Sequence, residues 1–193
     1  EENHLGFFGI DGEYSYSNSD NEAFPTLGMA FGLEGGFKTN LDESSRSFGY
    51  VVPSFSLDHK LTADGRLVLA TKFKGHFIIG NGYEFYQAAS IGGDNGLRGF
   101  RFQRFTGKTA YFQNTDLRYS FRGVKTGLMP VTPGIYGGFD YGRVWYPGED
   151  SDTWHNSYGG GFFLNGADVL SANFGLFHSA DGLRFAFGLG FGF

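Results

Sequence analysis

The chain has 193 residues, a net charge of −5 and no cysteine. The length suffices for one domain, the missing cysteine excludes a disulfide framework or a thiolate metal site, and the acidic balance argues against a nucleic-acid-binding surface. Aromatic residues make up 19% of the chain and charged residues only 18%, with 33 glycines, so an all-β sandwich, a lipocalin-like barrel and a membrane barrel remain. No apolar run approaches the roughly 20 residues of a membrane helix.

Two-residue alternation of apolar with small or polar side chains, the period of a β-strand, runs through most of the chain. In the first half it predicts strands at residues 5–17, 26–38, 47–59 and 66–79. Within residues 26–38, Met29 and Phe31 share one face, and Gly32 and Glu34 share the other. A short segment at residues 83–88 then leads into the one long stretch that does not alternate.

Residues 92–107 form this irregular segment, and the rest of the chain is organised around it. It carries five glycines, and three arginines are evenly spaced along it. A loop of this length in a compact domain is usually functional or disordered. Large apolar side chains argue against disorder, so we expect the loop to fold onto the rest of the protein. The arginines are Arg98, Arg101 and Arg104, and the apolar residues are Leu97, Phe100, Phe102 and Phe105.

Alternation resumes after the loop and predicts five more strands, at residues 111–121, 134–145, 157–164, 169–178 and 183–193. Most of the candidate strands have one face of large apolar residues and a second face of glycine, serine and charge. The second face is too small to make a good solvent surface, whereas Phe and Tyr on the first face suit lipid. We therefore predict an all-β, antiparallel transmembrane β-barrel of about 8 strands, with 8–10 possible. Phe193 ends the last alternating segment and fits a strand that closes such a barrel.

Two aspartates on the polar faces of the strands after the loop form a constellation with a loop arginine. If the loop folds into the lumen, Arg98 can reach both Asp116 and Asp140. Arginine suits this role because its planar fork makes bidentate, charge-assisted hydrogen bonds. The alternative is a mobile surface loop with solvated arginines and two unrelated inward aspartates, and the spacing alone leaves both open.

Three short motifs resemble one family of outer-membrane barrels. Leu97, Arg98, Gly99 and Phe100, after two glycines, resemble the (V/L)RG(F/Y) motif of the sixth extracellular loop in the BamA/TamA/surface-antigen family, the outer membrane protein 85 superfamily. Residues 114–118 (NTDLR) and 138–145 (GFDYGRVW) resemble the N-x-E-L-R and F-x-D-x-G strands that follow that loop. The resemblance covers residues 24–193. It implies that Asp140 holds Arg98 inside the barrel and that Asp116 is a secondary partner.

The resemblance also implies a location in the outer membrane of a Gram-negative bacterium and a role in assembly or translocation of outer-membrane proteins or lipids. The expected partners are outer-membrane lipids, client outer-membrane proteins or a second copy of the chain, with no nucleic acid. The pairing of Arg98 with Asp140 and Asp116, called the Arg98 lock below, is structural. We therefore expect no cofactor, no metal and no enzymatic activity. A membrane-embedded hydrolase is disfavoured because no catalytic triad can be assembled from the sequence.

The chain departs from the family pattern in size. It has about half the strands of a family barrel and carries no periplasmic transport-associated domains. We interpret residues 1–193 as a single barrel domain in which residues 1–20 form an extra strand or element. An alternative function is a small non-catalytic barrel that serves as a membrane anchor or interaction module.

Overall fold

The computed structural model describes residues 6–41, 46–127, 129–148, 152–167 and 169–191 and is all-β. Its strands are β1 (Phe7–Ser17), β2 (Gly28–Asn40), β3 (Ser47–Lys60), β4 (Leu67–Gly80), β5 (Ala89–Ile91), β6 (Phe105–Gly107), β7 (Thr109–Ser120), β8 (Val124–Lys125), β9 (Pro130–Trp145), β10 (His155–Gly166), β11 (Leu170–Ser179) and β12 (Gly182–Phe191). A single turn of 3₁₀ helix, η1 (Phe85–Gln87), precedes β5. No helix within the described ranges is long and apolar enough to cross a membrane.

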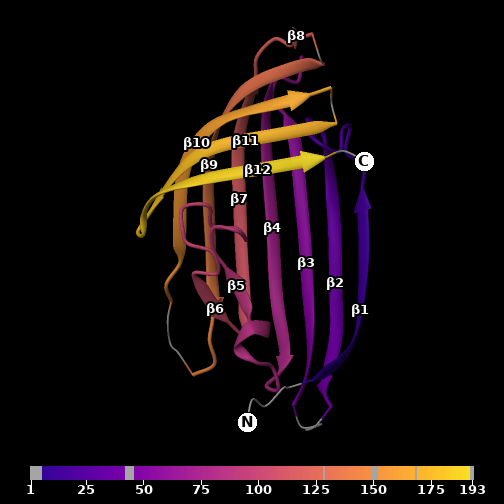
Figure 1. Cartoon of the computed structure of the whole chain (residues 1–193), viewed down its shortest axis with the longest axis vertical. Coiled ribbons are helices and arrows are strands. Elements are labelled where there is room, and N and C mark those ends of the chain that lie inside the picture. Colours follow the sequence, from indigo (N-terminus) through magenta and orange to yellow (C-terminus); the bar gives the residue numbers. More distant parts are fainter. Residues whose placement is uncertain (1–5, 42–45, 128, 149–151, 168, 192–193) are drawn as a thin grey trace.

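One antiparallel sheet holds the long strands in the order β1-β2-β3-β4-β7-β9-β10-β11-β12, and β8 adds a short pairing to β9 (Figure 1). The all-β, antiparallel prediction is confirmed. Among the described residues the sheet is not closed into a barrel, and the strand number differs from the predicted 8, although the nine long strands lie within the range of 8–10. The segment expected as an extra element is a full member of the sheet, because β1 pairs with β2 from Phe7↔Asn40 to Ser17↔Ala30. Among the described residues, β1 and β12 each have a pairing partner on one side only, so the sheet is open.

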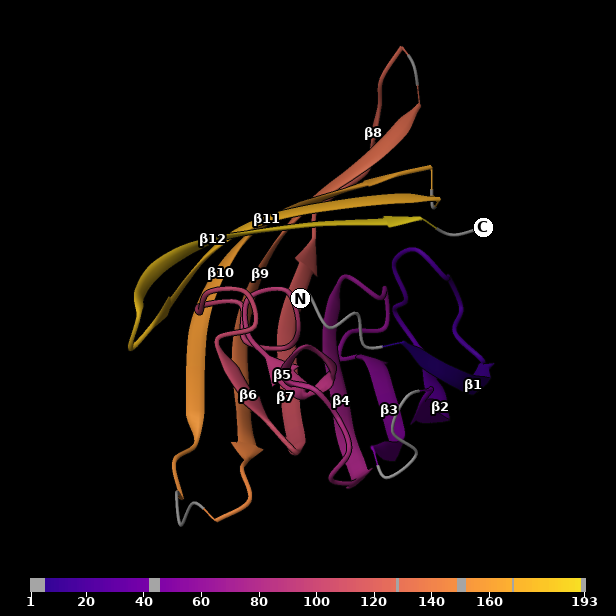
Figure 2. The same ribbon diagram turned by 60° about the horizontal axis from the view of Figure 1, so that its bottom comes forward.

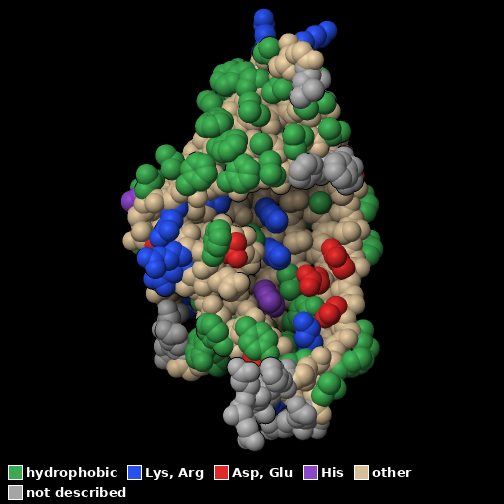
Figure 3. Space-filling view, in the orientation of Figure 1, with side chains coloured by type: hydrophobic (Ala, Val, Ile, Leu, Met, Phe, Trp, Pro, Cys, Tyr) green, Lys and Arg blue, Asp and Glu red, His purple; other side chains and the backbone are tan. Residues whose placement is uncertain are grey.

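The outer face of this sheet is apolar. Phe31, Phe55 and Phe73 lie directly opposite one another on β2, β3 and β4, and residues directly opposite in a sheet share a face. Phe31 is 41% exposed and Phe55 is 38% exposed. In Figure 3, hydrophobic side chains cover β9–β12, whereas Lys, Arg, Asp, Glu and His line the hollow below them. Large apolar side chains therefore point away from the hollow, as the alternation predicts.

The concave side of the sheet is filled by two segments that fold inward. Figure 2 shows the sheet curling around the segment between β4 and β7. That segment packs against β3, β4 and β7 in a buried cluster of Phe48, Ile78, Ala89, Ile91, Leu97, Phe100, Ala110 and Phe112. The turn between β1 and β2 supplies Phe24 to a second cluster, with Tyr136, Phe163 and Phe177. The two clusters make a core on the side where a wide barrel would hold water.

Candidate functional site

The segment predicted as one long irregular loop ends in a short strand. Residues 105–107 form β6, which pairs with β5 and leaves residues 92–104 as the irregular part. A tight turn starts this part, because the N–H groups of Asn95 and Leu97 both donate to the carbonyl of Gly92, at 3.0 and 2.8 Å. Gly96 has a φ of +96°, and a Cβ there would overlap the ring of Phe112. Only glycine meets both conditions at this position.

Two apolar side chains of the loop anchor it to the sheet. Leu97 is 0% exposed and Phe100 is 4% exposed, and each fully buried side chain of this size contributes about 1.5–3 kcal/mol to folding. The loop folds onto the rest of the protein as expected, but Phe102 does not take part in this packing and is 78% exposed. Its neighbour Phe105 is half-buried and stacks on His155 of β10, with ring centroids 3.6 Å apart.

Between Leu97 and Phe100, the side chain of Arg98 points toward the inner face of the sheet and forms hydrogen bonds with Asp140 of β9. Its Nη2 donates to Asp140 Oδ1 at 2.6 Å, and its Nε donates to the same oxygen at 3.0 Å. The backbone N–H of Arg98 also donates to Asp140 Oδ2, at 2.9 Å. Asp140 is fully buried. The arginine and the loop backbone are therefore fixed together on one carboxylate.

Asp116 of β7 is the second partner of Arg98. Arg98 Nη2 donates to Asp116 Oδ1 at 2.7 Å, and Nη1 donates to Asp116 Oδ2 at 3.1 Å, which is the bidentate geometry that an arginine fork favours. The side chain of Asp116 retains 24% exposure, unlike that of Asp140. The guanidinium also lies over the ring of Phe177 on β11, 4.1 Å from its centroid. The structure thus brings together all three residues of the predicted constellation.

Two further residues complete the environment of Asp140, and the sequence analysis gave neither of them a role. Asn114 Nδ2 donates to Asp140 Oδ1 at 2.7 Å and to the carbonyl of Gly96 at 2.6 Å. Ser157 Oγ donates to Asp140 Oδ2 at 2.8 Å from its position directly opposite Asp140 on β10. The sequence signal that would have identified Ser157 is a polar residue on an otherwise glycine-rich inward face.

Gly99 fits closely against two strands on the far side of the lock. Its N–H donates to Ser157 Oγ at 3.2 Å, and its carbonyl accepts from Ser179 Oγ of β11 at 2.6 Å. A Cβ at Gly99 would lie 2.6 Å from the Cβ of Ser157 and 3.0 Å from that of Ser179. The glycine after the arginine is therefore required by space rather than by backbone conformation.

Electrostatics hold the loop arginine in its charged form. Burial disfavours the charged guanidinium, but the hydrogen bonds to Asp140 and the charge of Asp116 outweigh burial and raise the pKa of Arg98 above its ordinary value. No group of three or more His, Cys, Asp or Glu in the described part of the chain is placed to hold a metal ion. The charge of Arg98 is compensated within the site by Asp140 and Asp116.

The other predicted loop residues lie apart from the lock. Arg101 is exposed, and Arg104 Nε donates to Asp181 at 2.9 Å in the turn between β11 and β12. Phe193, predicted to end the closing strand, lies outside the described residues.

A second arginine fixes the turn between β1 and β2 at the other end of the concave side. Arg118 of β7 donates from Nη2 to Asp58 Oδ1 of β3 and to the carbonyl of Pro25, both at 2.6 Å. Its guanidinium also lies over the ring of Phe24, 4.4 Å from the centroid. Phe24 in turn packs on Phe163 of β10, with ring centroids 4.6 Å apart. The sequence analysis assigned no role to this cluster, because the polar turn gave no sign of folding inward.

Comparison with known proteins identifies the fold. No protein-family model matches the sequence, and no curated protein matches it either. The structure is similar to the crystal structure of BamA from Haemophilus ducreyi lacking POTRA domains 1–3, with a TM-score of 0.71 and 19% sequence identity. The match covers 95% of this chain and 42% of that chain, so this chain spans less than half the length of the BamA chain it matches. The chain therefore has the fold of a large part of that protein's barrel.

Proposed function

We propose that the chain is an outer-membrane barrel element of the BamA-like type, with a role in assembly or translocation of outer-membrane proteins or lipids. The observation that carries this proposal is the loop lock: Arg98 is held on the concave side by Asp140 and Asp116, at 2.6 and 2.7 Å. The lock acts by fixing the loop, so the proposed role is not enzymatic.

The outer face supports a location in the outer membrane of a Gram-negative bacterium. The nine long strands have 10–16 residues each. A tilted strand needs about 9–11 residues to cross the hydrocarbon core. Large side chains such as Ile10 and Phe185, 73% and 67% exposed, would be solvated by lipid tails rather than by water.

The open edges support a role that involves pairing with another strand. A sheet edge in lipid leaves backbone N–H and C=O groups without water, at a cost of several kcal/mol per group. β1 and β12 have such edges among the described residues, so in a membrane each needs a further strand. A strand of a client outer-membrane protein or of a second copy would satisfy these groups.

The filled concave side favours a second candidate function, a non-catalytic anchor or interaction module. The loop locked by Arg98 and the turn held by Arg118 occupy the space through which a translocated chain would pass. Insertion of an unfolded client barrel into liposomes that contain the purified chain separates the two functions. Faster insertion than into empty liposomes, slowed by Asp140→Ala, supports the assembly role. Equal rates in both liposomes reject it in favour of the anchor.

A further inference from the structure

Two lysines on the concave face of β4 have no direct ion-pair partner among the described residues. Lys72 and Lys74 alternate with outward residues and line two neighbouring cavities, Lys74 the first and Lys72 the second. No ion pair or side-chain hydrogen bond in the described part of the chain engages either lysine. Residues two apart on a strand are about 6.6 Å apart, so both ammonium groups can reach one ligand.

The neighbouring strand places hydroxyl groups beside these lysines. Ser54 of β3 lies directly opposite Lys74, and Ser56 lies directly opposite Lys72. Directly opposite residues point to the same face of the sheet, with Cβ atoms about 4.5–5.5 Å apart. The four side chains form a compact patch of hydrogen-bond donors, and Ser56 lines the same cavity as Lys72.

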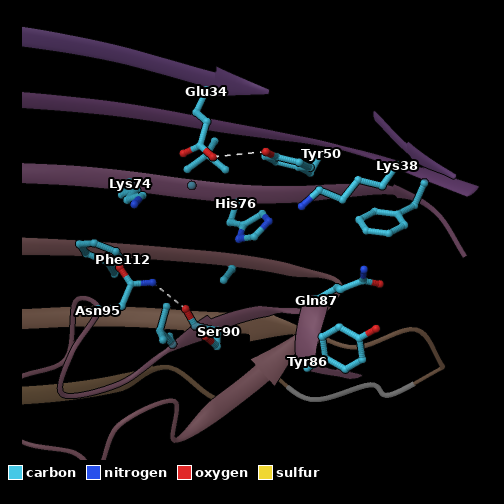
Figure 4. A pocket seen from close by; sticks show the side chains of 15 residues that line it. Glu34, Lys38, Tyr50, Lys74, His76, Tyr86, Gln87, Ser90, Asn95 and Phe112 are labelled. Carbon is cyan, nitrogen blue, oxygen red and sulfur yellow. Dashed lines mark hydrogen bonds between the residues drawn. The ribbon is translucent and has the colours of Figure 1, made fainter. Parts of the chain in front are cut away.

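Most carboxylates near the patch have other partners, and the balance beside Lys74 is positive. In the second cavity, Asp58 and Asp116 are paired with Arg118 and Arg98, and Asp94 accepts a hydrogen bond from the backbone N–H of Gln103 at 3.1 Å. In the first cavity, shown in Figure 4, Lys38 and Lys74 line the wall together with Glu34, and the hydroxyl of Tyr50 donates to Asp11 at 2.7 Å and lies 3.4 Å from Glu34. Figure 4 also shows Lys38 and His76 on the same wall as Lys74.

The cavities have room for more than a single ion. Their volumes are about 510 and 410 Å³, and both are lined by Asn95 of the loop and Phe112 of β7, so they adjoin at these two side chains. A ligand whose charged group lies between the lysines has space on both sides for an uncharged remainder.

We propose that Lys72, Lys74, Ser54 and Ser56 bind the phosphate group of a phosphorylated small molecule or of a lipid headgroup. A phosphate monoester carries nearly two negative charges near pH 7 and offers three acceptor oxygens, which match two ammonium groups and two hydroxyls. A carboxylate has two oxygens and one charge and would leave part of the patch unused. This inference is independent of the proposed role in membrane assembly, because none of the four proposed ligand-binding residues belongs to the Arg98 lock, although Arg98 and Asp116 also line the second cavity.

Calorimetric titration of the purified chain in a maltoside detergent and phosphate-free buffer tests the site, with glycerol 3-phosphate as probe. We expect Lys72→Gln and Lys74→Gln each to weaken binding roughly tenfold, and the double variant more than tenfold. Lys125→Gln, on the exposed β8, is the charge-matched control and should bind like the unmodified chain. Unheated gel mobility identical to that of the unmodified chain shows that each variant is folded. Failure of the probe to bind, or equal binding by the double variant, overturns the proposal.

Two further probes test the ligand class and its source. Succinate, a dicarboxylate of similar charge, should bind more weakly than glycerol 3-phosphate, and Ser54→Ala with Ser56→Ala should reduce that preference. Equal binding of the two probes overturns the assignment to phosphate. Dihexanoyl phosphatidic acid distinguishes the sources: tenfold tighter binding than glycerol 3-phosphate identifies a lipid headgroup, and equal binding identifies a soluble phosphorylated molecule.

Discussion

Removal of the carboxylate at Asp140 should be the most damaging single change at the loop lock. Asp140 is fully buried and accepts hydrogen bonds from the side chain and backbone of Arg98, from Asn114 and from Ser157. Asp140→Ala leaves these donors unpaired and removes half the charge compensation of Arg98, at an expected cost of about 3–5 kcal/mol. Asp116→Ala should cost only about 1 kcal/mol, because Asp116 is partly exposed and Asp140 still pairs with the arginine.

The pairing itself is tested by a double-mutant cycle. Arg98→Ala alone leaves a buried carboxylate without its cation, so it should cost about as much as Asp140→Ala. The double variant should be no less stable than either single variant, which corresponds to a coupling energy of at least about 3 kcal/mol. Arg104→Ala is the matched control: the same residue type in the same loop, whose pair with Asp181 is more exposed and should contribute less than about 1 kcal/mol.

The assay is equilibrium unfolding by urea in detergent micelles, followed by tryptophan fluorescence, since barrels often unfold irreversibly on heating. The temperature at which the gel mobility of each variant shifts to that of the unfolded chain ranks the variants by stability independently. Additive losses from Arg98→Ala and Asp140→Ala would show that the two residues do not act as a pair. A loss from Asp116→Ala as large as that from Asp140→Ala would refute the ranking by burial.

Four other outcomes follow from the structure. Gly99→Ala should destabilise the chain by about 1–3 kcal/mol in the same urea assay, because the new Cβ would clash with the Cβ atoms of Ser157 on β10 and Ser179 on β11. An unchanged urea midpoint of unfolding would mean that the loop shifts to make room for the methyl group. Arg118→Ala should cost about 3–5 kcal/mol and make the turn at residues 18–27 accessible to protease, whereas a protected turn would contradict its anchoring role. Burial raises the pKa of Asp20, but hydrogen bonds from Thr26 and Leu27 outweigh it and lower that pKa below its ordinary value. The stability from Asp20 should therefore be present above the ordinary carboxyl pKa and be lost as the pH falls through the depressed value, and Asp20→Asn should abolish this acid dependence in pH-titrated unfolding. Native mass spectrometry in a mild detergent should show a monomer, and a dimer would show that copies pair through their edges.

The sequence predicts the strands well because alternation is a local signal. The face of Phe31 or Phe55 follows from counting along one strand, and each lies on the predicted outer face. Counting does not show which inward residues of distant strands meet, because that depends on how the sheet curves. Ser179 and Phe177 reach the loop from β11 only because β9–β12 bend over the hollow, and no spacing in the sequence encodes that bend.

The pairing of Arg98 with Asp140 and Asp116 is easier to predict than the rest of the site, because charge restricts the residues that can be partners of a buried arginine. A buried arginine requires a carboxylate, and few inward carboxylates follow the loop. The inward turn at residues 18–27 lacks such a signal. Its anchor, Phe24, is a single aromatic in a polar stretch, which is also what a solvent-exposed turn can contain. The same ambiguity affected Phe102, which has the size of a core residue and lies exposed.

The number of long strands restricts what can complete this sheet. Nine strands that are each antiparallel to the next leave β1 and β12 running in the same direction. Closure of one edge on the other is therefore a parallel pairing, which is slightly less stable per residue than an antiparallel one. A second copy inserted in the same orientation offers only parallel edges too. An antiparallel partner for either edge has to be a strand that is not one of the nine. In lipid each edge satisfies its backbone by pairing with a further strand, which is the pairing that strand addition by a client would supply.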